Sequence, residues 1–157
     1  MVDFLYNRGS ADLWDTLQPV DMIVDTIRVM LCTASYVADR DDDLVDAGGA
    51  NDAIDHELSG TGYVAWHGNS GRRTLASKTI TVDKPNNRTE FDAADVTWAA
   101  INAGTAAQAI LHKEGSIDDT TARLVSHIDT GGFPLVTNGT DLTIQWNTEG
   151  ILQLSTA

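Results

Sequence analysis

The sequence predicts an all-β protein, an antiparallel β-sandwich or jelly roll with a short N-terminal helical arm. Two observations carry this prediction. Apolar and polar residues alternate with a period of two in many short segments, most clearly where Leu142, Ile144 and Trp146 are separated by polar residues. The composition also suits strands joined by tight turns, since the 157 residues include 19 Asp, 18 Thr and 13 Gly but only 4 Glu.

We expect two parts, an N-terminal arm at residues 1–20 and a sandwich domain at residues 21–157. In the arm, the apolar residues Leu13, Trp14 and Leu17 recur at a spacing typical of a short amphipathic helix. A helix of this length is marginal alone, so it must dock either on the chain's own sheet or on a neighbouring subunit.

The first half of the domain contains one clear strand, an acidic stretch and a glycine-bearing loop. At residues 26–33 the alternation predicts a strand with Arg28 and Met30 on its outward face. Residues 39–57 carry eight acidic side chains against one arginine and are expected to form a surface excursion. Ser-Gly-Thr-Gly after Leu58 indicates a kink or bulge, and the loop follows at residues 62–73.

The second half reads as short strands separated by Gly, Pro and Asn turns, which favours a sandwich over a βαβ fold. Residues 106–113 form an apolar run of buried-strand length, although its alanines also suit a helix. We expect Asn138-Gly139 to form a tight hairpin turn and the last two strands to form a closing hairpin. The expected strands are residues 79–83, 88–92, 96–98, 106–113, 124–129, 133–137, 141–147 and 150–154.

The charge and the cysteine content exclude several classes of partner. A formal net charge of -13 repels phosphate backbones and anionic membranes, so nucleic acid and membranes are not expected partners, whereas a basic protein patch is compatible. Cys32 is the sole cysteine and should be a semi-buried hydrophobe. Asp3 interrupts the first residues and no long apolar stretch follows, so we expect synthesis in the cytoplasm.

Five segments resemble a family of small proteins encoded near the capsid genes of tailed bacteriophages. Members of this family with an assigned role are head decoration, or cement, proteins with a jelly-roll fold that bind the outer surface of the icosahedral shell. The resemblance implies a non-enzymatic protein of the capsid exterior, assembled in the host cytoplasm. It also implies no cofactor, and as partners the major capsid protein and copies of the chain itself in a dimer or trimer. The segments are residues 25–31, 57–63, 91–98, 142–146 and 150–152.

For such a role, we expect the apolar residues of the arm to contact the capsid, because they have no evident position in a sheet. The glycine-bearing loop supplies a second set, an aromatic residue and two arginines. The expected contact residues are Phe4, Leu5, Tyr6, Trp14 and Leu17, followed by Trp66, Arg72 and Arg73.

Other functions remain open on the sequence. A phage tail or head-tail connector component would share this architecture, and Trp66 in its glycine loop would suit a carbohydrate-binding module on a virion. An enzyme has little support, because no nucleophile or metal motif connects the four scattered histidines. Asp39, Asp41 and Asp43 begin like a calcium loop, but the later EF-hand positions do not match, so a solvated acidic loop is favoured.

Overall fold

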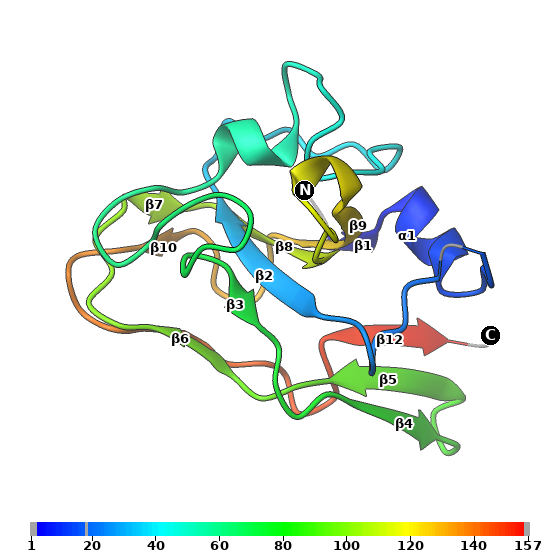
Figure 1. Ribbon diagram of the computed structural model, residues 1–157. Helices are drawn as coiled ribbons and strands as arrows, with labels where there is room; N and C mark the ends of the chain where they lie inside the picture. The colour runs from blue at the N-terminus through cyan, green and yellow to red at the C-terminus, as the bar shows by residue number, and fades with distance from the viewer. Residues whose placement is uncertain (1–2, 18, 156–157) are drawn as a thin grey trace.

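The computed structural model describes residues 3–17 and 19–155 and confirms the all-β class (Figure 1). The first layer is a five-stranded sheet in which all neighbouring strands are antiparallel, in the order β1-β9-β8-β2-β3. The central strand β8 pairs with β2 along its whole length and with β9 from Ala109 to Lys113. These strands are β1 (Phe4–Leu5), β2 (Ile27–Cys32), β3 (Arg73–Thr74), β8 (Gln108–Lys113) and β9 (Arg123–Ile128).

The second layer is one long antiparallel ribbon that is interrupted into three small sheets. Residues 88–106 run antiparallel to residues 135–155, through the pairs β5–β12, β6–β11 and β7–β10, and β4 adds a further strand beside β5. Between the last two pairs, the Ile101 N–H donates to the Thr140 carbonyl at 3.1 Å. The strands are β4 (Thr79–Asp83), β5 (Arg88–Asp92), β6 (Val96–Trp98), β7 (Thr105–Ala106), β10 (Leu135–Val136), β11 (Leu142–Ile144) and β12 (Leu152–Ser155).

This ribbon corrects two expectations about hairpins. The strands β11 and β12 do not pair with each other, and the Asn138-Gly139 turn does not join paired strands. The strands β10, β11 and β12 instead take their partners from residues 88–106, which lie between 29 and 67 residues earlier in the chain and satisfy their backbone hydrogen-bonding groups.

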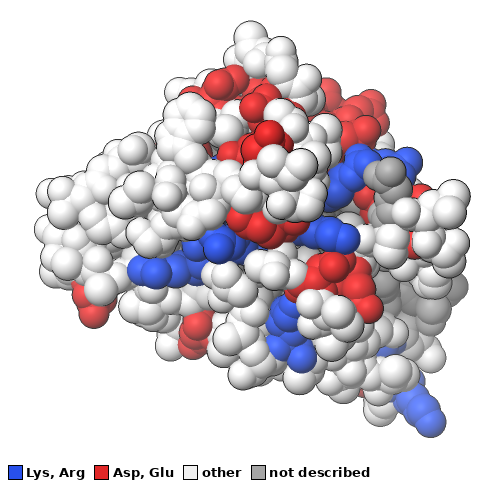
Figure 2. Space-filling view, in the orientation of Figure 1, with Lys and Arg blue, Asp and Glu red and all other residues white. Residues whose placement is uncertain are grey.

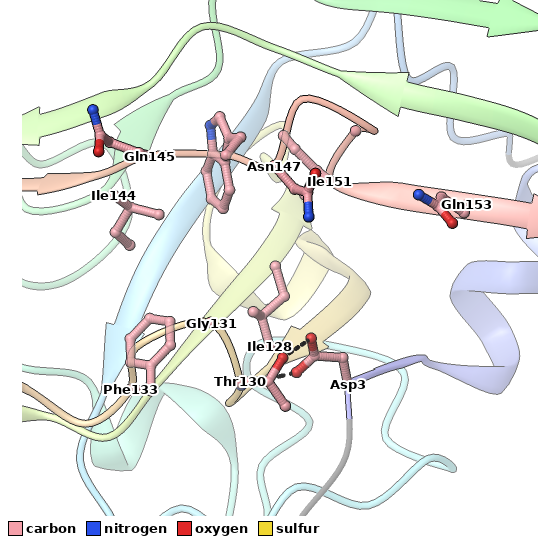
Figure 3. A pocket seen from close by; sticks show the side chains of 12 residues that line it. Asp3, Ile128, Thr130, Gly131, Phe133, Ile144, Gln145, Asn147, Ile151 and Gln153 are labelled. Carbon is pink, nitrogen blue, oxygen red and sulfur yellow. Dashed lines mark hydrogen bonds between the residues drawn. The ribbon is translucent and has the colours of Figure 1, made fainter.

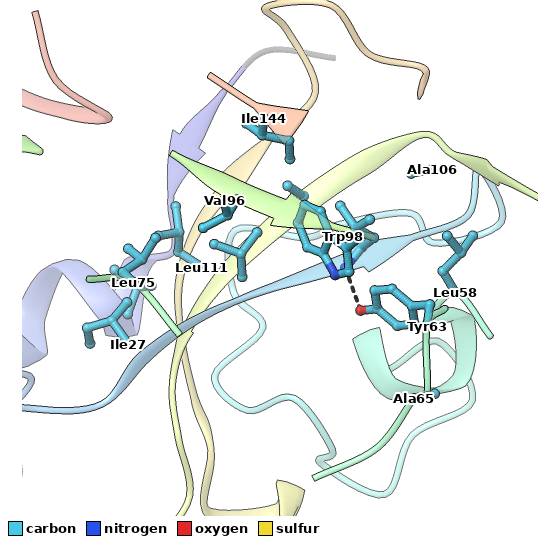
Figure 4. Close-up of a cluster of buried hydrophobic side chains, with 14 of the residues drawn as sticks. Ile27, Leu58, Tyr63, Ala65, Leu75, Val96, Trp98, Ala106, Leu111 and Ile144 are labelled. Carbon is cyan, nitrogen blue, oxygen red and sulfur yellow. Dashed lines mark hydrogen bonds between the residues drawn. The ribbon is translucent and has the colours of Figure 1, made fainter. Parts of the chain in front are cut away.

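The main core lies between the two layers (Figure 4). As predicted, β2 directs Ile27, Val29 and Leu31 into it, and all three are fully buried. Trp98 from the ribbon is also fully buried, and its indole N–H donates to the Gly71 carbonyl, so the ring is fixed in position. Burial of such aromatic and aliphatic side chains is the main stabilising contribution to the sandwich.

The opposite face of the first sheet is buried as well, which the alternation did not predict. Met30 was expected to face outward, but it is fully buried beneath the chain that follows β2. That chain, residues 33–57 with the 3-10 helix η1 (Ala53–His56), turns Tyr36 and Val45 onto the sheet. The acidic stretch therefore covers this face of the first sheet and exposes its polar side chains on the outside, whereas a surface loop without buried residues was expected.

The N-terminal residues belong to the same fold. The strand β1 pairs with β9 at the edge of the first sheet, and the helix α1 (Asn7–Asp12) packs on β9. The helix begins earlier than the predicted apolar stripe, and Leu13 lies just past its end. A Cβ on Gly9 would lie 2.5 Å from the Leu124 carbonyl oxygen, so only glycine allows this close approach. Within the described ranges, no helix has the length and apolar character needed to cross a bilayer.

Candidate functional site

Two of the expected contact residues are part of the first sheet, and Tyr6 follows them directly in the chain. Phe4 and Leu5 form β1 opposite His127 and Ser126, and both side chains are half-buried. Tyr6 is fully buried, and its hydroxyl lies 3.0 Å from the hydroxyl of Tyr36. The expectation of no position in a sheet is therefore wrong for Phe4 and Leu5, because the free edge of β9 was not visible in the local sequence pattern.

Trp14 and Leu17 are, in contrast, almost fully exposed, at 80% and 90%. They follow Leu13, which lines an apolar opening between the N-terminal segment and the sheet β4-β5-β12. We call this opening the apolar cleft. Its lining residues are Leu5, Leu13, Met22, Ile80, Thr89, Phe91, Leu152 and Leu154.

The apolar cleft exists because the inner face of this sheet extends beyond its cover. Two cross-strand rows lie on that face, one through Ile80, Phe91 and Leu152 and the next through Val82, Thr89 and Leu154. Phe91 is buried, but Ile80 and Val82 are more than half exposed. Seven of the twelve exposed large hydrophobic side chains of the described part of the chain belong to residues 13–24 or to this sheet, namely Trp14, Leu17, Ile23, Val24, Ile80, Val82 and Leu154.

Trp66 is the second exposed aromatic residue and lies in a loop that is held by hydrogen bonds. Its side chain is 63% exposed, while its backbone has a φ of 82°, a left-handed conformation that is costly for a residue with a Cβ. Two carboxylates hold the loop in this shape, since the Trp66 N–H donates to Glu57 at 3.0 Å and the His67 N–H donates to Asp119 at 3.1 Å.

Arg72 binds both of these carboxylates from inside the protein. Its Nη2 donates to Glu57 at 2.7 Å and to Asp119 at 3.1 Å, and its Nη1 also donates to Asp119. Burial disfavours the charged form of Arg72, but the hydrogen bonds that its guanidinium donates to Glu57 and Asp119 outweigh that effect and raise its pKa. With a side chain that is 0% exposed, Arg72 is a support for the Trp66 loop and not a contact residue, which corrects the expectation.

The strained backbone gives a direct test of the loop. We expect the Trp66→Gly variant to be more stable than Trp66→Ala by about 1 kcal/mol, because both lose the exposed indole but only alanine keeps the left-handed penalty. Urea denaturation of the two variants measures the difference. An alanine variant that equals or exceeds the glycine variant would show that residue 66 leaves this conformation in solution.

Arg73, the last expected contact residue, is half-buried on the edge strand β3. Its guanidinium lies 5.9 Å from the centroid of the Trp98 ring, within range of a cation–π interaction. Figure 2 shows a band of Lys and Arg side chains across the middle of one face, with acidic groups on either side of it. The net negative charge is therefore uneven over the surface.

Two of the three aspartates of the calcium hypothesis accept hydrogen bonds from other residues of the protein. Asp39 accepts the Asp41 N–H at 3.0 Å, and Asp41 accepts the Asn7 side chain at 2.6 Å. Among residues 3–17 and 19–155, no group of three or more His, Cys, Asp or Glu side chains is placed to hold a metal ion.

Two of the four histidines are buried and are held away from the surface. Burial, reinforced by the positive charge of Arg72, lowers the pKa of His112 to about 3, and burial also lowers the pKa of His127. The imidazole of His127 lies 2.5 Å from the Gln108 side-chain oxygen and stacks on Phe4. Both histidines are therefore buried side chains of the first sheet, on β8 and β9.

Comparison of the chain with protein-family models, with curated proteins and with solved structures finds no match.

Sequence reasoning missed Glu57 and Asp119, which hold the Trp66 loop. They lie 15 and 47 residues from Arg72 along the chain, so no local spacing connects them. One signal in the sequence could have indicated them. Arg72 lies between glycines and strand-forming residues, and a charged side chain in such a segment needs oppositely charged partners if the segment is buried.

Proposed function

We propose that this chain is a structural virion protein, a decoration or cement protein that binds the outer surface of a tailed-phage capsid and stabilises the shell. The observation that carries the proposal is the apolar cleft together with the exposed Trp14 and Leu17, which follow the lining residue Leu13 in the chain. A concentrated apolar surface on a highly charged protein is typical of a protein–protein interaction site. The five segments that resemble decoration proteins supply the identity of the partner.

The charge of the chain supports the outer surface as the place of binding. Packaged DNA fills the interior of a capsid, and a protein with a net charge of -13 would be repelled there. On the outside, a protein that binds only the assembled shell stabilises it by mass action, and many copies multiply the effect of a modest contact.

Co-sedimentation with undecorated phage heads tests the proposal. We expect the wild-type chain to pellet with the heads and the double variant Trp14→Ala/Leu17→Ser to bind about tenfold more weakly or worse, because exposed aromatic anchors dominate protein interfaces. Deleting residues 1–20 would also remove β1 and Tyr6 from the fold, so exposed side chains are substituted instead.

Ile117→Ser is the matched control. Ile117 is 78% exposed, comparable with Trp14 at 80% and Leu17 at 90%, but it belongs neither to residues 13–24 nor to the sheet β4-β5-β12. The control variant should bind like the wild type, and all three proteins should unfold at the same denaturant concentration because exposed sites contribute little to stability. Wild-type protein that stays in the supernatant at every salt concentration would contradict the capsid role. A double variant that binds as well as the wild type would show that the surface around the apolar cleft does not contact the capsid.

A further inference from the structure

A separate pocket lies at the open edge of the sandwich, between the end of β9 and the chain that joins β11 to β12 (Figure 3). Its volume is about 360 Å³, near the lower limit of the range for sites that bind small ligands. In Figure 3, Phe133, Thr130 and Asp3 lie along one wall, and Asn147 and Ile151 lie along the other. We call it the edge pocket.

Both walls of the edge pocket are fixed by hydrogen bonds. On one side, the Asp3 carboxylate accepts the backbone N–H groups of Asp129 and Thr130 at 2.8 and 3.0 Å. On the other side, the Trp146 indole donates to the Ala94 carbonyl at 3.1 Å. A site that is already rigid loses little conformational entropy when a ligand binds.

The pocket combines half-buried aromatic rings with free amide groups. Phe133 and Trp146 both line it and pack against the main core, which leaves part of each ring exposed. Asn147 uses its side-chain oxygen to accept the Glu149 N–H at 3.0 Å. Within the described residues, the Asn147 amide nitrogen and the whole Gln145 amide make no hydrogen bond, so donors and an acceptor remain available at the rim.

We propose that the edge pocket binds a neutral saccharide of one or two sugar rings. The apolar C–H face of a pyranose packs on exposed aromatic surface, and its hydroxyl groups match amides, which both donate and accept hydrogen bonds. Asp3 and the net charge of -13 disfavour sialic acids, uronic acids and other anionic sugars. The inference does not depend on the proposed capsid role, because binding is a property of the isolated chain.

Isothermal titration of the purified chain with neutral oligosaccharides tests the inference, using maltose, cellobiose, mannobiose and N,N′-diacetylchitobiose as probes. At least one probe should bind saturably. The double variant Gln145→Ala/Asn147→Ala should bind that probe about tenfold more weakly, since each lost hydrogen bond accounts for a few-fold change in affinity. Both residues are exposed, so the variant should keep the unfolding midpoint of the wild type.

Trp66→Ala is the control, because it removes an exposed indole that does not line the edge pocket. This variant should bind the probe as the wild type does. The inference is overturned if none of the four probes binds. It is also overturned if Trp66→Ala loses binding while the double amide variant keeps it, which would place the sugar at the Trp66 loop.

Discussion

Replacing Arg72 by methionine is expected to lower the free energy of unfolding by about 3–5 kcal/mol. The substitution keeps most of the side-chain volume but leaves Glu57 and Asp119 without a cation, and their side chains are only 1% and 5% exposed. Two buried carboxylates are costly to keep charged in that position when no cation balances them. Equilibrium urea denaturation at pH 7.5 measures the change.

Two further variants separate the ion pairs from simple packing. In Arg72→Met/Glu57→Gln/Asp119→Asn the carboxylates become neutral amides, so most of the lost stability should return. Arg88→Met is the comparison, because Arg88 has three carboxylate partners but its side chain is 16% exposed, against 0% for Arg72. Its removal should have a much smaller effect on the free energy of unfolding. A small loss for Arg72→Met, comparable with that of Arg88→Met, would mean that water reaches Glu57 and Asp119 in solution.

The strands were predictable where one face is buried and the other is exposed. In β6 the order buried, exposed, buried at Val96, Thr97 and Trp98 reproduces the alternation in the sequence. In β2 the alternation misled the prediction for Met30, because the strand is covered on both faces. The uninterrupted apolar run from Val29 to Cys32 was the signal that such a doubly covered strand leaves.

Strand pairing and the residues of the candidate site were much less predictable. The edge strand β1 pairs with β9 across more than 120 residues, and local patterns carry no information about such a partner. The same limitation explains the wrong prediction for Arg72. Its place in a glycine-bearing loop suggested exposure to solvent, but Glu57 and Asp119, which are distant in the sequence, hold it in the interior. Trp14, Leu17 and Trp66 are exposed, so their side chains are accessible to a partner.

The stability of the protein should fall between pH 7.5 and pH 5 because of His112. This side chain is fully buried on β8, and its pKa is lowered to about 3 from an ordinary value near 6.5. Between these two values the unfolded chain binds a proton that the folded chain excludes, so acid favours unfolding, whereas above pH 6.5 the group has no effect. At pH 5 the loss amounts to about 2 kcal/mol from this residue alone.

The variant His112→Leu isolates this contribution. Its cost at pH 7.5 should be small, because the His112 Nε2 atom has no hydrogen-bond partner and its Nδ1 lies 3.4 Å from the Lys113 carbonyl. Between pH 7.5 and pH 5, the free energy of unfolding of the variant should fall by about 2 kcal/mol less than that of the wild type. Urea denaturation at each pH measures this difference. Titrating carboxylates are common to both proteins and cancel in the comparison. Parallel pH dependences would show that water or a charge partner reaches His112, and that the interior of the first sheet is more open than its packing indicates.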